Sequence, residues 1–534
     1  MTATATAAPH PPIKPAGGRF RSVIWSEWSK FRTVRGWVIG LVAAAGLCVA
    51  FTFLVANGKH EGGCTGPPSP GSGPNSPGSG CYTGHPFVPT GPDGEAVADS
   101  YQLVDRPLSG DGTITARVSS LTGLTSTNPV DVAPSIAATR PGLAPWAKAG
   151  ILITPSTTQG SPYAAVIATG SHGIRFQYDY THDRAGLPGA VSGAAPSWVR
   201  LTRSGDALTG YDSADGTTWH EIGVAHLAGL PATVIVGLLV TSPVSFQGSS
   251  GGAATQATAT FDHVTLNGHA ISDDLQGRSI GTGANDFYPT LGTGGYRRSG
   301  PSLVLSGSGD IAPAVGLAGG DTASNSLLFG LIVGLIVVIV IATMFITVEY
   351  RRGLIRTTFT ATPNRGRVLA AKAVVIGAAA FAIGALAAAL AVPLGEHILN
   401  DNGDYVFPSS TLTVARIILG SGALVAVTAV AAVAVGTILR RSADAVTGAI
   451  VVFILPYIIG SSISGGAAEW LFRVTPAAGF AVLGAMPHSA QVSYPYTMAN
   501  GYYPLAPGAG LLVLCAYAAV AVAIATSLLR RRDA

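Results

Sequence analysis

The sequence predicts an α-helical integral membrane protein with six transmembrane helices and an all-β sandwich inserted after the first of them. Two observations predict this fold. Charged residues make up 11% of the 534 residues and hydrophobic residues 48%, whereas a soluble domain contains roughly 25% charged residues. Within this apolar chain, residues 57–325 contain short alternating runs separated by turn residues, which are typical of strands.

Six apolar runs are each long enough to cross a hydrocarbon core of about 30 Å. None of them contains Asp, Glu, Lys, Arg or His, the residues from which proton-coupled carriers build their relays. Pro456 is expected to interrupt the fifth run. The runs are Trp37–Ala56, Leu327–Val348, Ala373–Val392, Ile417–Leu439, Ala445–Ile463 and Gly508–Leu529.

The orientation follows from lysine and arginine, which accumulate in cytoplasmic loops. They cluster before the first run, between the second and third, between the fourth and fifth, and after the sixth. We therefore expect a cell-membrane protein with both termini in the cytoplasm and the large β domain outside the cell. The net charge of +4 then reflects this topology and contact with membrane lipids, and no nucleic-acid partner is expected.

These patterns divide the chain into regions. The first apolar run is longer than the 7 to 15 residues of a signal-peptide core, so it is expected to remain as a membrane anchor. The regions are a cytoplasmic N-terminus with an interfacial helix (1–36), the first transmembrane helix (37–56), an extracellular Gly/Pro/Ser linker (57–95), the β-sandwich (96–268), an extracellular Gly-rich extension that either adds to the sheet or forms a stalk (269–326), and five transmembrane helices with a cytoplasmic loop at 349–367 (327–534).

The four cysteines separate into two kinds. Cys64 and Cys81 bracket the Gly/Pro/Ser tract on the side expected to be oxidising, where a disulfide would close this loop; two free thiols are the alternative. Cys48 and Cys515 fall inside apolar runs and are expected to be packed or to face lipid. No cysteine spacing suggests a metal site.

The β region carries one explicit hairpin, because Asp215-Gly216 lies between two strand-like runs. The segments Trp146–Ile153, Trp198–Arg203 and Gly210–Trp219 resemble concanavalin-like jelly-roll domains of the laminin-G and DUF1349 type. That resemblance implies a jelly-roll sandwich and, for many such domains, glycan binding. Trp198, Trp219 and Phe261 are interpreted as core residues, with a sugar-stacking platform as the alternative.

Catalysis by this domain is not expected. A glycosidase needs two carboxylates held about 5 to 10 Å apart. The glutamates of the segment are Glu61, Glu95 and Glu221, with no acidic run that would place two of them on one strand face.

The stretch 349–367 is a basic amphipathic segment between two apolar runs, and it suits contact with a partner. Its part Glu349–Pro363, together with Ser26–Arg35, Gly436–Ala445 and Arg531–Ala534, resembles permease subunits of type-2 ABC exporters from high-GC bacteria. The chain contains no Gly-x-x-x-x-Gly-Lys-Ser/Thr loop, so it is not expected to be an enzyme that hydrolyses ATP itself.

The resemblance implies a permease that pairs with itself or a sibling permease and binds a separate ABC ATPase subunit. The resemblance also implies that the permease chain binds no cofactor itself and that the partner subunit uses ATP. By the same resemblance, the residues that couple to the ATPase would be Glu349, Tyr350, Arg351, Arg352, Gly353, Arg356 and Thr357. An elbow helix at the membrane surface would contain Glu27, Lys30, Arg32 and Arg35.

A second function remains open on the sequence alone. The chain could instead be a membrane-anchored extracellular protein that binds a glycan or peptide through the sandwich. A neighbouring reading frame with a P-loop would favour the exporter, whereas glycan binding without an ATPase partner would favour the anchored binding protein.

Overall fold

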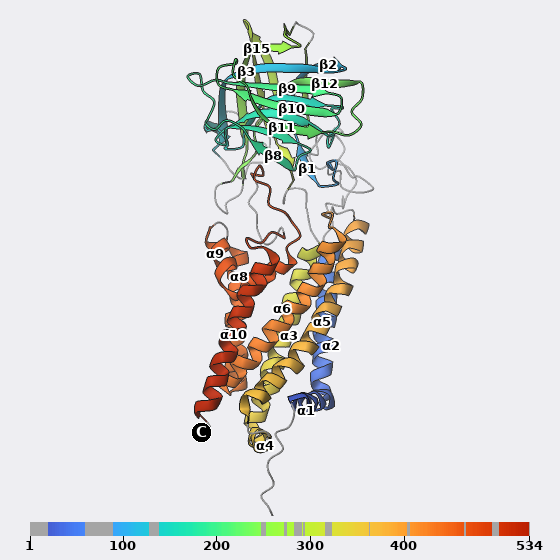
Figure 1. Ribbon diagram of the computed structural model, residues 1–534, viewed down its shortest axis with the longest axis vertical. Helices are drawn as coiled ribbons and strands as arrows, with labels where there is room; N and C mark the ends of the chain where they lie inside the picture. Colours follow the sequence, from blue (N-terminus) through green and yellow to red (C-terminus); the bar gives the residue numbers. More distant parts are fainter. Residues whose placement is uncertain are drawn as a thin grey trace, which may run out of the picture.

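A computed structural model describes residues 20–58, 89–127, 138–246, 252–271, 275–281, 291, 294–314, 323–361, 364–402, 406–463, 466–493 and 501–532. The predicted disulfide between Cys64 and Cys81 falls outside these residues. The described chain forms an all-β part and a bundle of long helices below it (Figure 1).

The β-domain is an antiparallel sandwich, as the alternating runs predict. One sheet of nine strands has the order β11-β10-β9-β3-β15-β19-β18, with β4 and β16 at its side, and the other has the order β17-β2-β12-β5-β6-β7-β8. The strand bounds are β1 Val97–Asp99, β2 Tyr101–Ser109, β3 Gly112–Ser126, β4 Thr139–Pro141, β5 Lys148–Thr154, β6 Ala164–Thr169, β7 Ile174–Tyr178, β8 His182–Ala185, β9 Ser197–Ser204, β10 Ala207–Ser213, β11 His220–His226, β12 Thr233–Thr241, β13 Ser245–Phe246, β14 Gly252–Ala253, β15 Thr255–Leu266, β16 His269–Ala270, β17 Gln276–Ile280, β18 Gly295–Ser299, β19 Ser302–Gly307 and β20 Ile311–Pro313.

The core of the β-domain lies between the two sheets, because alternate residues of each strand point to opposite faces. Phe261 is fully buried there, together with residues such as Ile114 and Val199. Trp198 and Trp219 are half-buried and lie outside this cluster. The core interpretation therefore holds for Phe261 and not for the two tryptophans. The hairpin at Gly216, which has φ +76°, joins β10 to β11 as predicted.

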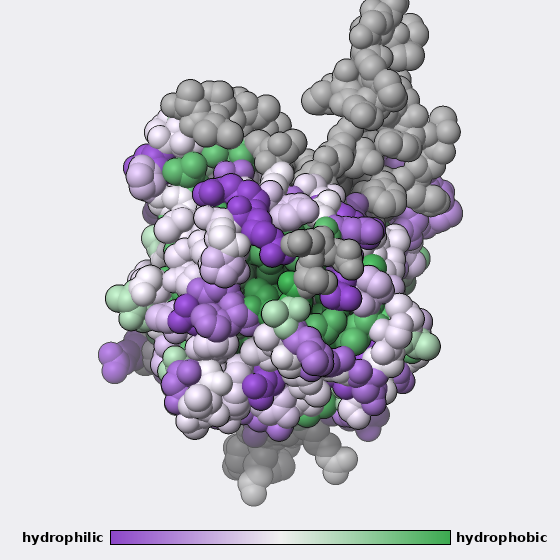
Figure 2. All heavy atoms as spheres, turned by 90° about the horizontal axis from the view of Figure 1, so that it is seen from above, coloured by the Kyte–Doolittle hydropathy of each residue, from purple (hydrophilic) through white to green (hydrophobic). Residues whose placement is uncertain are grey.

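Strands continue beyond residue 268, where the sequence predicted a Gly-rich extension. β17 pairs with β2, β19 with β15, and β20 with β1. β17 and β19 thus add to the two sheets of the sandwich, which is the first of the two expected alternatives, whereas β20 forms a separate two-stranded sheet with β1. The far end of the domain, seen in Figure 2, has hydrophilic side chains at its rim and a hydrophobic patch near its centre.

Among the residues that the structure describes, six helical segments are long and apolar enough to cross a membrane. They are α2 Arg35–Gly58, α3 Ala323–Arg351, α5 Arg365–Asp401, α6 Thr411–Leu439, the pair α7 Ser442–Phe453 and α8 Leu455–Ser462, and α10 Pro507–Arg532. All six match the predicted runs. Several begin earlier or end later than the runs, because a helix can continue past the hydrocarbon into polar residues.

Four shorter features complete the bundle. The fifth span is interrupted at Ile454, next to Pro456, as the sequence indicated. Of the short helices, α1 Phe20–Thr33 lies in the N-terminal region for which an interfacial helix was predicted, and α4 Leu354–Ala361 lies within the predicted loop 349–367. Between the last two spans, α9 Gly466–Val474 leads to the 3-10 helix η2 Pro476–Leu483, all of whose residues are buried. Hydropathy did not predict α9 or η2, because neither approaches the length of a span.

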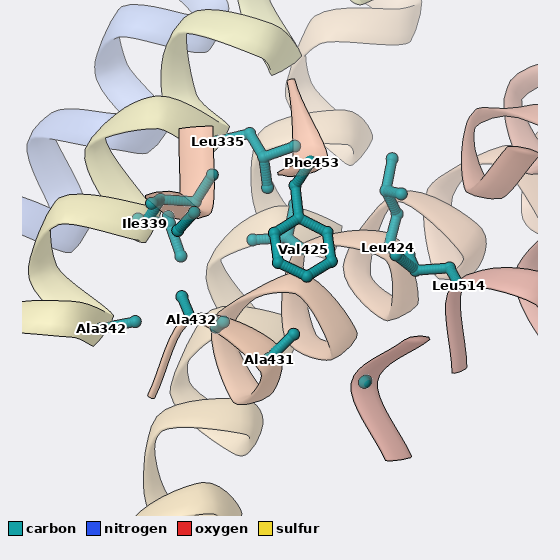
Figure 3. Packing of buried hydrophobic residues seen from close by; sticks show 14 of the residues in the cluster. Leu335, Ile339, Ala342, Leu424, Val425, Ala431, Ala432, Phe453 and Leu514 are labelled. Atoms are coloured by element: carbon teal, nitrogen blue, oxygen red, sulfur yellow. The ribbon is translucent and has the colours of Figure 1, made fainter. Parts of the chain in front are cut away.

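Apolar packing holds the helices together. Leu335 of α3, Val425 of α6 and Phe453 of α7 lie close together, while Leu424 of α6 lies beside Leu514 of α10 (Figure 3). α2 and α3 approach closely at Gly330, where an added Cβ would lie 2.1 Å from the Cys48 carbonyl oxygen. Small residues permit such approaches between membrane helices. The outward faces carry exposed large apolar side chains, among them Ile39, Leu54, Leu390, Leu419, Ile458 and Leu512, as expected of helices that contact lipid.

Candidate functional site

The candidate site lies at the end of the bundle away from the β-domain, where α1 and α4 are found (Figure 1). α1 is amphipathic, and its apolar face is buried against the bundle. Phe31 contacts the edge of the Phe345 ring, with centroids 5.8 Å apart, and Val23 packs with Val368 and Ala371 of α5. Burial of this face anchors α1 along the base of the helices.

Glu27 lies on the same buried face and is the centre of an ionic cluster with Lys30, Glu349 and Lys372, here called the base cluster. The Lys372 ammonium donates to Glu27 Oε2 at 2.6 Å and to Glu349 Oε1 at 2.7 Å. Lys30 donates to Glu27 Oε1 at 2.7 Å, and its Nζ lies 3.5 Å from Glu349 Oε1. Two lysines and two glutamates make the cluster neutral.

Burial makes this geometry consequential. Lys372 is 0% exposed and Glu27 is 1% exposed. An isolated buried charge is costly, so the pair stabilises only while both partners are present with good geometry. The Lys372 Nζ also lies 4.5 Å from the centre of the Phe345 ring, which favours the cation further. The base cluster therefore fixes α1 to the end of α3 and the start of α5.

The base cluster also reaches α4. The Lys30 Nζ lies 3.5 Å from Thr358 Oγ1. Burial alone would lower the pKa of Lys30, but the hydrogen bond and charge of Glu27 and the charge of Glu349 outweigh it, so the pKa of Lys30 is raised. Lys30 thus stays charged at neutral pH and connects α1 with α4.

The predicted coupling residues fall into two groups. Glu349 belongs to the base cluster, and the Tyr350 ring lies 5.2 Å from the Arg440 guanidinium carbon. The others surround α4, which begins after Gly353 turns the chain with φ +70°. Arg351, Arg352, Gly353 and Thr357 are exposed, and Arg356 lies within α4.

The predicted elbow residues also separate. Glu27 and Lys30 enter the base cluster, whereas Arg32 and Arg35 are exposed. Sequence reasoning counted Lys372 as one of the basic residues flanking a span and missed its role. The one signal was a lysine directly before the apolar run that starts at residue 373. Lys372 and Glu27 are so far apart in the sequence that no spacing pattern connects them.

A second surface is present on the outer face of the nine-stranded sheet. The Arg200 guanidinium lies 3.6 Å from the centre of the Trp219 ring. Arg117 pairs with Asp262, with Nε 2.6 Å from Oδ1, and lies over Trp198 at 5.7 Å. Half-exposed tryptophans beside arginines can stack against a planar or sugar ligand.

Asp215 belongs to the adjoining hairpin and has a structural role. Its Oδ1 accepts hydrogen bonds from the backbone N–H groups of Thr217 and Thr218, at 2.8 and 2.7 Å. These bonds hold the pKa of Asp215 well below its usual range. The carboxylate therefore shapes the turn that precedes Trp219.

Comparisons with known proteins add little to this geometry. No family model and no curated protein matches the chain. Among solved structures, scytalido-glutamic peptidase with a transition state analog inhibitor is 10% identical, covers 39% of this chain and 98% of its own, and has a TM-score of 0.25. A functionally unknown protein from Saccharomyces cerevisiae is 15% identical. The match covers 30% of this chain and 71% of that protein, with a TM-score of 0.19. Peanut lectin with a 9mer peptide is 12% identical. The match covers 34% of this chain and 89% of the lectin, with a TM-score of 0.17. At these scores the likenesses indicate neither an activity nor a ligand for this chain.

Proposed function

We propose that this chain is the permease subunit of an ATP-driven ABC exporter and is coupled to a separate ATPase subunit. Paired with a second permease, it forms the translocation path in the cell membrane. In this orientation both termini and the base cluster are cytoplasmic, and the β-domain is extracellular. Six helices of spanning length and the absence of a P-loop from the sequence support the proposal.

The observation that carries the proposal is the base cluster. An ATPase that pushes on α4 must move the spanning helices, which requires a stiff connection. Lys372 provides one, because a single buried ammonium bonds Glu27 of α1 and Glu349 of α3 from its position in α5. The exposed residues around α4 then offer a docking surface whose displacement would reach three elements at once.

Charge reversal at the docking surface tests this function. The tagged protein is purified from native membranes in mild detergent, its partners are identified, and ATPase activity is measured. A P-loop subunit is expected with the wild-type chain. The double variant Arg351→Glu/Arg352→Glu is expected to lose most of this subunit, because two exposed cations at the docking surface become anions.

Arg473→Glu is the matched control, since Arg473 is an exposed arginine of α9, at the other end of the bundle, that pairs with Glu469. This change should leave the ATPase bound. Recovery of the wild-type chain without an ATPase, or equal recovery with all variants, would contradict the exporter function.

A membrane-anchored binding protein is the second candidate. The half-exposed Trp219 under Arg200 favours it. In that case the full chain in nanodiscs would retain cell-wall glycan in a pull-down, and Trp219→Ala would abolish retention, without any ATPase partner.

A further inference from the structure

The β-domain and the helical part meet at a defined contact. The Gln491 side chain donates from Nε2 to the Tyr180 carbonyl oxygen at 2.7 Å. Gln491 lies in the loop after η2 and is 1% exposed, although its loop neighbours Pro487, His488 and Ala490 are exposed. A buried amide with a single carbonyl partner from the other part of the protein is a specific connection and not surface contact.

The acceptor side of this contact is a strained turn. Asp179 and Tyr180 have φ +43° and +56°, a left-handed conformation that is unusual for a bulky residue. Three bonds around the turn hold it in place. The Tyr180 hydroxyl donates to Asp99 Oδ2 at 2.8 Å, the Gly160 N–H donates to the same oxygen at 2.9 Å, and the Asp179 N–H donates to the Tyr163 carbonyl at 3.0 Å.

Asp99 is withdrawn from water at this point. It is 4% exposed, and burial raises its pKa to about 7. The Tyr163 and Tyr180 rings meet edge to face, with centroids 4.9 Å apart. Strained backbone persists where the surroundings over-determine it, and such sites often serve clamps and switches.

The donor side of the contact leads directly into the bundle. η2 is completely buried and packs against α6 and α10. An added Cβ at Gly510 of α10 would lie 2.2 Å from the Ala478 carbonyl oxygen of η2. Directly after η2, the Gly484 carbonyl accepts a hydrogen bond from Arg416 of α6 at 2.5 Å. A shift of α6 or α10 would therefore reach Gln491 through a short, fixed piece of chain. In Figure 1 this chain rises from the bundle toward the underside of the β-domain.

We propose that the contact between Gln491 and the Tyr180 turn is a latch that keeps the β-domain seated on the helical part, and that it opens when η2 and α10 move during export. The first half depends on the fold alone. The second half rests on the proposed function, because it needs a transport cycle to move α10.

The latch is tested by hydrogen–deuterium exchange on the full chain in nanodiscs. The reporters are the amides of Tyr163 and Asp179, which bond across the base of the turn. Gln491→Ala leaves the Tyr180 carbonyl without its donor, and we expect these amides to exchange roughly tenfold to a hundredfold faster. Gln491→Glu, which keeps the size but removes the donor, should do the same. Gln276→Ala, an exposed glutamine of β17, is the matched control and should leave the exchange unchanged.

The outcomes separate the latch from the proposed function. Exchange in β5 checks that each variant is folded. If both Gln491 variants exchange like wild type at Tyr163 and Asp179, the latch is overturned. If the latch is present, trapping the ATPase complex with ATP and vanadate should accelerate exchange at the same amides in the wild-type chain, and unchanged exchange there would overturn its opening during export. Failure to find any ATPase contradicts the proposed function, while the Gln491 variants still decide the latch.

Discussion

The Lys372 side chain places a positive charge at a fully buried position, within 2.7 Å of two carboxylates from different helices. Replacing it with methionine keeps the aliphatic length and removes the charge. Glu27 and Glu349 would then face each other without a cation between them. Breaking a buried ion pair in this way costs about 3 to 5 kcal/mol, so Lys372→Met is expected to lower the midpoint of thermal unfolding in detergent markedly.

Lys30→Met is the matched control for this prediction. The Lys30 side chain is 40% exposed, and an exposed ion pair contributes about 1 kcal/mol or less. The triple variant Glu27→Gln/Glu349→Gln/Lys372→Met should recover part of the loss, because it removes the three buried charges and leaves only Lys30, whose side chain is 40% exposed. Equal midpoints for the two lysine variants would show that the base cluster does not hold α1 in place.

The base cluster shows why single residues of the candidate site resist prediction from sequence. Glu349, Arg351 and Arg352 stand together in one basic segment, so their proximity could be read directly. Glu27, Lys30 and Lys372 come from distant segments, and their meeting depends on how α1 lies against α5. The position of α1 is decided by the tertiary packing of Val23 and Phe31. In the sequence, this packing is visible only as the amphipathic spacing of the two residues.

At the scale of elements, the spans were predictable because the hydrocarbon thickness sets a length that apolar runs reveal. α9 and η2 were not, since their nine and eight residues are far fewer than a span requires. Likewise, β17 to β20 lie within a Gly-rich stretch whose alternation is weak. Their pairing with β1, β2 and β15 is set by partners that are distant in sequence.

The packing of α2 against α3 depends on Gly330. Gly330→Ala would place a methyl group 2.1 Å from the Cys48 carbonyl oxygen, so the two helices must separate. Overpacking of this kind costs about 1 to 3 kcal/mol, and we expect a lower midpoint of thermal unfolding in detergent.

The matched control is Gly46→Ala in α2, where nothing lies within 4 Å of the added Cβ. Its effect should stay within about 0.5 kcal/mol of zero, as for other exposed positions. A loss of stability as large as that of Gly330→Ala would mean that glycine itself, and not the close approach of the helices, matters at both positions.

At the scale of the whole molecule, the β-domain lies at one end of the bundle, while α1, α4 and the end of α10 lie at the other (Figure 1). If all six segments cross the membrane, the even number of crossings places the N-terminus and the C-terminus on the same side. The excess of lysine and arginine near α1, α4 and the end of α10 supports the proposal that this side is cytoplasmic. The latch and the base cluster would then act on opposite faces of the membrane.

This arrangement predicts which positions an impermeant reagent can reach. In a background without the four native cysteines, Ser204→Cys places a thiol on the β-domain and Thr360→Cys places one on α4, both at exposed positions. Intact cells treated with a membrane-impermeant maleimide should label position 204 and spare position 360, which should react after permeabilisation. The reverse pattern would invert the topology and expose the docking surface to the outside, where no ATP-driven subunit could use it. Labelling of both positions in intact cells would mean that no membrane separates them. Helices that cross the membrane would place the β-domain and α4, which lie at opposite ends of the bundle, on opposite sides.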